Sequence, residues 1–265
     1  GLVGSEMCIR DRYLIFTTMG LLDDVVSVPR RTMTLFFVID TSGSMAGNKI
    51  GAVNDAVENV LPMLDEISAS NPDAEIKVAA LEFSSGCNWL YDEPKLASEF
   101  VWQDVSASGL TSLGAACQEL NTKLSRNGFM QTPSGSFAPA IILLSDGGPT
   151  DDFYGGLSKL KANNWFKNAI KIAIAIGDDA DKDVLTQFTG TNEAVFTVHN
   201  IDALKQIIRV VAVTSSQIGS KSSTAGDTTK QEQVIKDVTE ATKDIDGAQS
   251  EAAPANYTDN YDDWD

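Results

Sequence analysis

Apolar and helical segments alternate along the chain between about Thr32 and Thr214. Five apolar runs are short, nearly continuous and rich in β-branched and aromatic residues. They span 35–39, 76–83, 140–144, 170–176 and 194–198. Such runs are typical of strands that other elements cover on both faces. A short edge strand expected within the irregular stretch 89–102 brings the sheet to six strands.

Between these runs, apolar residues recur at spacings of three and four, which is the period of an amphipathic helix. The first helix begins at Asn48, contains Pro62, which predicts a kink or a break, and ends before Asn71-Pro72. The others are expected over 111–127, 157–168, 181–188 and 201–213. The alternation predicts an α/β, Rossmann-like fold, with a mostly parallel six-stranded sheet and helices on both faces.

The composition changes after Thr214. Residues 215–265 contain eleven acids and four lysines, a net charge of −7, with Ser, Thr, Gly and Ala between them. We expect an acidic, flexible and disordered tail that the fold does not need, with at most one weak helix. The apolar positions of that helix are Val234, Ile235, Val238 and Ile245.

Residues 1–31 are expected to be an N-terminal extension. The first dozen residues, GLVGSEMCIRDR, resemble a peptide that recurs at the ends of translated environmental sequences as apparent contamination. We expect them to be an artefact, and they are left out of the fold prediction.

The chain carries a formal net charge of −17. This charge argues against a nucleic-acid backbone or an anionic membrane as partner and favours cations and basic protein surfaces. Cys8, Cys87 and Cys117 lie far apart without C-x-x-C spacing, which indicates neither a zinc site nor a disulfide framework. Such cysteine usage fits a reducing compartment, and no membrane span or secretory leader is readable, so we expect a cytoplasmic protein.

Oxygen-bearing side chains gather at three places where a strand ends or a helix begins. The first, D-T-S-G-S-M, follows the run 35–39 and offers Asp40, Ser42 and Ser44 at every second residue. The others are Thr111 in G-L-T-S and Asp146 in S-D-G-G-P-T-D-D, directly after the run 140–144. If the first and fourth strands are neighbours, all three places meet beyond the carboxyl ends of the strands. Hydroxyl and carboxylate oxygens without sulfur or imidazole suit a hard cation.

Other interpretations account for fewer of these residues. A helix N-cap could use Ser42 or Ser44, but it leaves the two aspartates and Thr111 unexplained. A serine hydrolase needs a G-x-S-x-G elbow and a histidine base, and the single histidine, His199, belongs to none of the three places. A phosphatase of the haloacid-dehalogenase type needs a second Asp where Ser42 stands, and no G-x-x-x-x-G-K-[ST] loop occurs. We therefore expect that the chain is not an enzyme.

In these residues and their order, the chain resembles a von Willebrand factor A (vWA) domain with a metal-ion-dependent adhesion site (MIDAS). The family pattern is D-x-S-x-S, then a distant Thr, then a strand that ends in Asp-Gly. It matches Asp40, Ser42, Ser44, Thr111 and Asp146. The resemblance covers 32–214 and implies a Rossmann-like vWA domain over that range.

The resemblance also implies a function. Ser42, Ser44 and Thr111 would bind Mg²⁺ (Mn²⁺ or Ca²⁺ being alternatives) directly, and Asp40 and Asp146 would act mainly through water. The open coordination position of the ion would take a Glu or Asp from a partner protein. The expected function is thus a Mg²⁺-dependent protein–protein interaction module.

The sequence R-R-x-x-x-L-F-F-V-I-D-T-S-G-S-M, together with D-G-G-P-T-D-D, is most similar to the bacterial tellurium-resistance (TerY-like) branch of the family. This similarity implies an adaptor in tellurite or stress resistance. Two alternatives stay open. One is a non-catalytic vWA subunit of an ATP-driven metal-insertion or remodelling complex, and the other is a surface adhesin.

Overall fold

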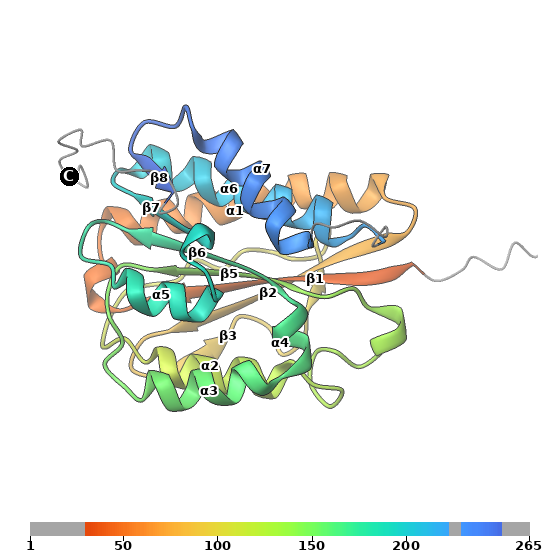
Figure 1. The fold of residues 1–265 in the computed structure, drawn as a ribbon, viewed down its shortest axis with the longest axis horizontal. Coiled ribbons are helices and arrows are strands. Elements are labelled where there is room, and N and C mark those ends of the chain that lie inside the picture. Colours follow the sequence, from red (N-terminus) through yellow and green to blue (C-terminus); the bar gives the residue numbers. More distant parts are fainter. Residues whose placement is uncertain (1–29, 223–228, 251–265) are drawn as a thin grey trace, which may run out of the picture.

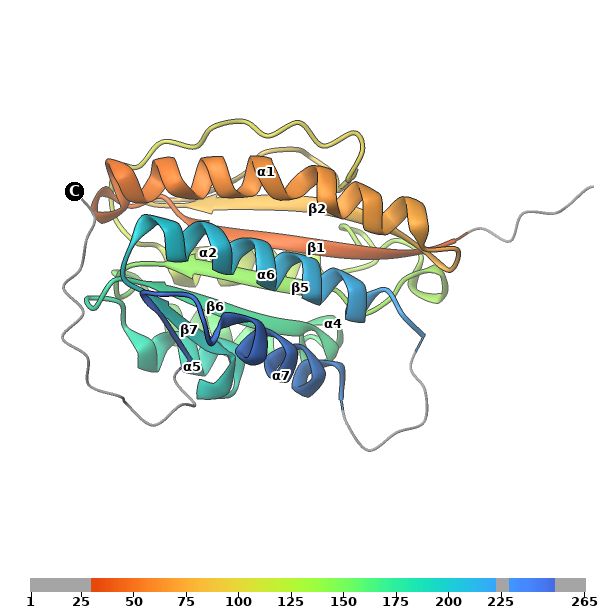
Figure 2. The same cartoon turned by 90° about the horizontal axis from the view of Figure 1, so that it is seen from above.

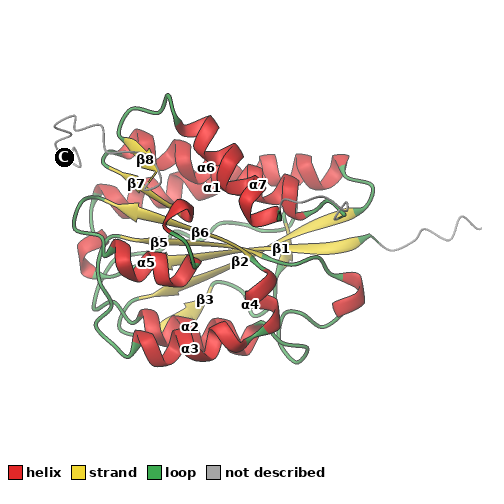
Figure 3. Cartoon of the chain, in the orientation of Figure 1, coloured by secondary structure: helices red, strands yellow, loops and turns green. Residues whose placement is uncertain are grey.

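The computed structural model describes residues 30–222 and 229–250. Figure 1 shows a central sheet with helices packed on both of its faces, and Figure 3 shows the same layers coloured by element type. The predicted α/β architecture is confirmed.

Eight strands among the described residues form one sheet. They are β1 (Arg31–Asp40), β2 (Ala74–Phe83), β3 (Cys87–Trp89), β4 (Lys95–Leu96), β5 (Ala140–Ser145), β6 (Ile170–Ile176), β7 (Val195–Val198) and β8 (Ala248–Ser250). Their spatial order is β3-β2-β1-β5-β6-β7-β8, with β4 also paired to β2. The five longer strands run parallel, and β3, β4 and β8 are antiparallel at the edges. The sheet is mostly parallel as predicted, but it has two strands more than the six expected. The additional strands are β8 and one of the two short strands near 89–102.

Helices cover the sheet in two layers. They are α1 (Asn48–Ser70), α2 (Leu113–Lys123), α3 (Phe153–Ala162), α4 (Asn164–Asn168), α5 (Lys182–Thr189), α6 (Ile201–Gly219) and α7 (Lys230–Thr242). On one face α1, α6 and α7 lie side by side, as Figure 2 shows, and α2, α3 and α5 cover the other face. None of these helices combines the length and the apolar character that crossing a membrane requires.

β1 divides its side chains between two hydrophobic cores. Leu35, Phe37 and Ile39 join the core under α1 and α6, whereas Phe36 and Val38 join the core under α2 and α3. Successive side chains of a strand point to opposite faces, so a strand between two helical layers is apolar at every position. This is why residues 35–39 form a continuous apolar run.

Pro62 does not break α1, which continues to Ser70. A proline lacks the N–H for one backbone hydrogen bond and is normally destabilising in the interior of a helix. Val60, Leu61 and Leu64 are nevertheless buried around it. Burial of this apolar stripe keeps the helix continuous, and the predicted break is absent.

The prediction of a flexible tail after Thr214 needs correction, because most of the described part of 215–250 is folded onto the domain. α6 continues to Gly219, α7 buries Val234, Ile235 and Val238 against α6 and the sheet, and β8 pairs with β7. Residues 251–265 lie outside the described residues. The single predicted helix is α7, and its few apolar residues suffice because they lie on one stripe of the helix.

Polar contacts in the first turn of α7 stabilise the start of the helix and attach it to the sheet. Its first turn carries a capping box between Thr229 and Glu232. Between these two residues, the Gln231 side chain accepts from the backbone N–H of Lys171 and donates to the carbonyl of Lys171, both at 2.7 Å. The helix is therefore joined to β6 by hydrogen bonds as well as by apolar contacts.

Replacing Val238 by Ala tests this packing. The side chain is fully buried, so its truncation should lower the free energy of unfolding by about 2 kcal/mol in urea denaturation. Asp237→Ala, at an exposed position of the same helix, should leave that free energy nearly unchanged. Equal stabilities of the two variants would show that α7 does not pack on the domain.

Candidate metal centre

The carboxyl ends of β1 and β5 lie next to each other. These strands pair in parallel with Ile39 opposite Leu144, so Asp40 and Ser145 follow at the same edge of the sheet. The first and fourth predicted strands, β1 and β5, are therefore neighbours in the sheet. This pairing brings two of the three oxygen-rich places together, at the left end of the sheet in Figure 1.

Asp40 is fully buried and held by two hydrogen bonds. One carboxylate oxygen accepts from the Ser42 backbone N–H at 2.8 Å, and the other accepts from the Ser145 hydroxyl at 2.6 Å. Burial raises the pKa of Asp40 above its ordinary value, although these hydrogen bonds oppose the shift. A cation nearby would favour the charged form and relieve that cost.

Ser44 and Asp146 connect the loop that follows β1 to the loop that follows β5. The Ser44 hydroxyl donates to one Asp146 carboxylate oxygen at 2.7 Å and lies 3.0 Å from the Ser42 hydroxyl. The other Asp146 oxygen accepts from the Lys49 ammonium at 2.9 Å. Ser42 stands at the N-cap of a short 3-10 helix, but its side chain makes no capping hydrogen bond. Neither serine hydroxyl is thus occupied in capping.

Backbone hydrogen bonds bring the Thr111 loop to the same edge. The Gly43 N–H donates to the carbonyl of Gly109 at 3.1 Å, and the Ser108 N–H donates to the carbonyl of Thr41 at 2.7 Å. Gly109 has a φ of +83°, and a Cβ there would lie 2.5 Å from the Ser85 hydroxyl oxygen, so the loop requires glycine. On the far side, the Thr150 N–H donates to the carbonyl of Thr111 at 2.9 Å.

The hydroxyl of Thr111 makes no hydrogen bond within the described ranges, although the residue is buried. Within those ranges, the fully shielded side-chain atoms without a partner are the hydroxyls of Ser215, Ser216 and Ser250, so the Thr111 oxygen reaches solvent, where a cation could bind it. Among the described residues, no group of three or more His, Cys, Asp or Glu side chains could hold a metal ion. The donors at this edge are hydroxyls and two carboxylates, which fit a hard cation.

Two residues of the cluster were missed in the sequence. Ser145 directly precedes Asp146, and its position at the end of an apolar run next to an acid was a usable signal. Lys49 lies in the first turn of α1, where a lysine ordinarily indicates a solvated face, so nothing in its sequence position marked it. His199 lies apart, with its Nδ1 3.4 Å from an Asp178 carboxylate oxygen.

A family model described as the von Willebrand factor type A domain matches residues 34–210. The chain belongs to the von Willebrand factor type A domain family. Proteins of this family are mostly non-catalytic modules of protein interaction and adhesion. No protein with a curated description matches this vWA domain significantly in sequence.

Several solved structures share the fold. They include a von Willebrand factor type A protein from Catenulispora acidiphila (18% identity, TM-score 0.53), which covers 70% of this chain and 43% of its own. Proximal thread matrix protein 1 from the mussel byssus, with a zinc-occupied MIDAS motif, has 17% identity and a TM-score of 0.53. The match covers 71% of this chain and 48% of the mussel protein. The pilus adhesin SpaC from Lactobacillus rhamnosus GG, in its open conformation, has 17% identity and a TM-score of 0.55. The match covers 70% of this chain and 30% of the adhesin. This vWA chain spans less than half of each of these proteins.

Replacing Lys49 by Met tests the charge balance of the cluster. The Asp146 side chain is fully buried and would lose its counter-charge, so the metal-free protein should lose about 3 kcal/mol of unfolding free energy. Added Mg²⁺ can then supply the missing positive charge, so Mg²⁺ should raise the Tm of the variant more than that of the wild type.

The control is Lys205→Met, which breaks the exposed ion pair of Lys205 with Asp55 on the surface of α1 and α6. It should cost less than about 1 kcal/mol. Wild-type stability of metal-free Lys49→Met, or an unchanged response to Mg²⁺, would contradict the expected role of this lysine.

Proposed function

We propose that this vWA domain is a MIDAS-type interaction module that uses a divalent cation, Mg²⁺ before Mn²⁺ or Ca²⁺, to capture a partner protein. The observation that carries the proposal is the convergence of hydroxyl-bearing loops on one edge of the sheet. Ser42, Ser44 and Thr111 would hold the ion directly, and Asp40 and Asp146 would act mainly through water. When bound, the ion supplies an open coordination position for a carboxylate.

The hydrogen bonds of the two aspartates support their outer role. Both oxygens of Asp40 accept from groups of the chain, Ser42 N–H and the Ser145 hydroxyl. Both oxygens of Asp146 accept as well, from Ser44 and Lys49. Because both carboxylates are held in this way, neutral hydroxyls would lie nearest the ion. The ion would then keep much of its positive charge. A Glu or Asp of a partner protein would complete it.

Ser44 is the part of this arrangement that faces solvent. It is exposed, whereas Ser42, Thr111 and the two aspartates are buried. A partner carboxylate would therefore approach from the side of Ser44. The exposed side chain of Leu110, 59% accessible beside Thr111, offers an apolar contact next to that approach.

For the biological setting, we propose a cytoplasmic adaptor of the tellurium-resistance type. Its support is the similarity of the residues around Asp40 and Asp146 to that branch of the family. A surface adhesin is the second candidate, and the likeness in fold to the SpaC pilus adhesin favours it.

Removing the Thr111 hydroxyl tests the proposed ion site. Thr111→Val keeps the shape of the side chain but deletes one ligand, and Asp146→Ala deletes an acceptor for the water of the ion. Loss of such an outer group typically lowers metal affinity roughly 10–100-fold, and loss of the inner hydroxyl should cost at least as much. Calorimetric titration of Mg²⁺ into each protein measures the effect, with Thr239→Val, on α7, as the control for exchanging a hydroxyl for a methyl group.

Partner capture from a native extract should fall in parallel with metal affinity. The wild type should capture protein with Mg²⁺ and lose it in EDTA, while circular dichroism shows an unchanged fold, because the sheet packs without the ion. If Thr111→Val binds Mg²⁺ as tightly as Thr239→Val does, the ion site is not built as proposed.

A further inference from the structure

A cleft of about 870 Å³ lies at the amino ends of β1 and β6, opposite the candidate metal centre. Five cationic side chains line it, and no acidic residue of the described ranges does. They are Arg31, Lys167, Lys171, Lys221 and Lys230. The chain as a whole has 37 acids against 20 lysines and arginines, so a cleft whose charged lining residues, among those described, are all cations is a local reversal of charge.

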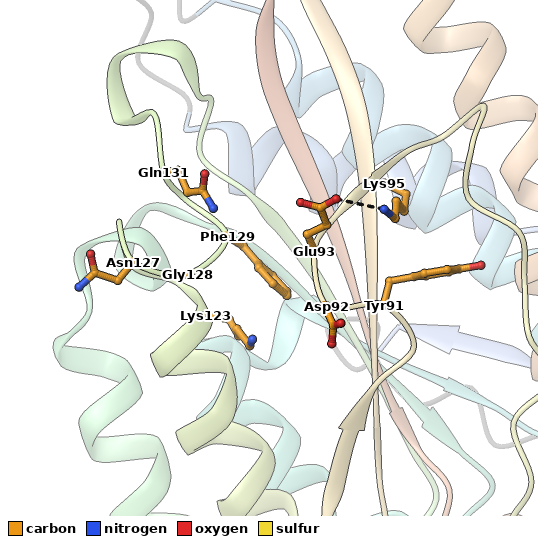
Figure 4. Close-up of a pocket in the computed structure, with 9 residues that line it drawn as sticks. All are labelled: Tyr91, Asp92, Glu93, Lys95, Lys123, Asn127, Gly128, Phe129 and Gln131. Atoms are coloured by element: carbon orange, nitrogen blue, oxygen red, sulfur yellow. Dashed lines mark hydrogen bonds and ion pairs between the residues drawn. The ribbon is translucent and has the colours of Figure 1, made fainter.

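The cations of this basic cleft have no carboxylate partner among the described residues. A second pocket, drawn in Figure 4, behaves differently. There the Lys95 ammonium lies 3.1 Å from a Glu93 carboxylate oxygen, and Asp92 also lines the pocket. Residues of opposite charge thus line that pocket together, whereas no carboxylate of the described residues balances the cations of the basic cleft.

Backbone and aromatic contacts fix three of the cations in place. The Lys171 ammonium donates to the carbonyls of Phe166 at 3.0 Å and Ala169 at 2.8 Å. The Lys230 ammonium likewise donates to the carbonyls of Gly219, the last residue of α6, and of Lys221 just beyond it. Arg31 stacks 3.8 Å from the centroid of the Phe137 ring. An ammonium has three N–H donors, so each lysine keeps one for a ligand.

Crowding and burial make the positive charge of the basic cleft costly. Burial lowers the pKa of Lys171 to about 8. The pKa of Lys230 is lowered as well, first by burial and then by the charge of Arg31. An anion in the cleft would offset both effects because it stabilises the charged forms.

We propose that the basic cleft binds a small anion that carries two or more phosphate groups. Five positive charges call for more than one negative charge, and phosphate oxygens suit both guanidinium and ammonium donors. The volume lies within the roughly 300–1,000 Å³ of small-molecule sites. The net charge of −17 would repel a nucleic-acid strand outside the cleft, so the ligand is a small molecule.

Titration of sodium tripolyphosphate into the full chain in EDTA, at fixed ionic strength, tests the proposal without any contribution from the metal centre. The wild type should bind it. Lys167→Gln combined with Lys221→Gln should weaken binding at least about tenfold, because two charged contacts are lost. Both side chains are exposed, so the variant should keep its fold. Lys159→Gln combined with Lys161→Gln, at exposed positions of α3, makes the same change in charge and should bind as the wild type does.

Three outcomes would overturn the proposal: no binding by the wild type, equal loss in the two double variants, or equally tight binding of a hexaglutamate peptide. Asp146→Ala separates this cleft from the metal centre, since it should keep tripolyphosphate binding in EDTA. In the same way, the Lys167→Gln and Lys221→Gln double variant should keep its affinity for Mg²⁺.

Discussion

The parallel pairing of β1 with β5 is the constraint on which the site depends. It places Asp40 and Ser145 at one edge of the sheet, where their side chains form a fully buried hydrogen bond of 2.6 Å. Asp146 follows directly and receives hydrogen bonds from Ser44, in the loop after β1, and from Lys49, in the first turn of α1. The paired residues are 97 to 105 positions apart in the sequence, so the cluster exists only when the sheet is assembled.

The two ends of the sheet carry opposite chemistry. At the carboxyl end, neutral hydroxyls gather around buried carboxylates. At the amino end, cations from β1, β6 and the ends of α4, α6 and α7 surround a cleft. β1 joins the two ends, with Arg31 at its start and Asp40 at its end. A predominantly acidic chain thus keeps a concentrated positive region at the end of the sheet opposite the carboxylates of the candidate metal centre.

Local patterns predicted much of this structure, and their limits are physical. The continuous apolar run 35–39 indicated a strand between two helical layers, and the hydroxyl spacing after it indicated the cluster at its tip. The packing of α7 on the domain was not predicted, because its charged residues outweigh the three apolar residues of its buried stripe. β8 has no apolar pattern, and it forms because β7 offers an open edge. Lys49 and the cations of the basic cleft come from distant segments, so only the assembled fold brings them to their sites.

The central claim is that Ser42, Ser44 and Thr111 jointly hold one divalent cation. Crystals of the protein grown with Mn²⁺, measured for anomalous scattering, test it most directly. The account predicts one strong peak between the three hydroxyl oxygens, at close to the roughly 2.1 Å typical of small octahedral dications, with Asp40 and Asp146 one water further out. A peak bound by the aspartates alone, or no peak at this edge of the sheet, would contradict it.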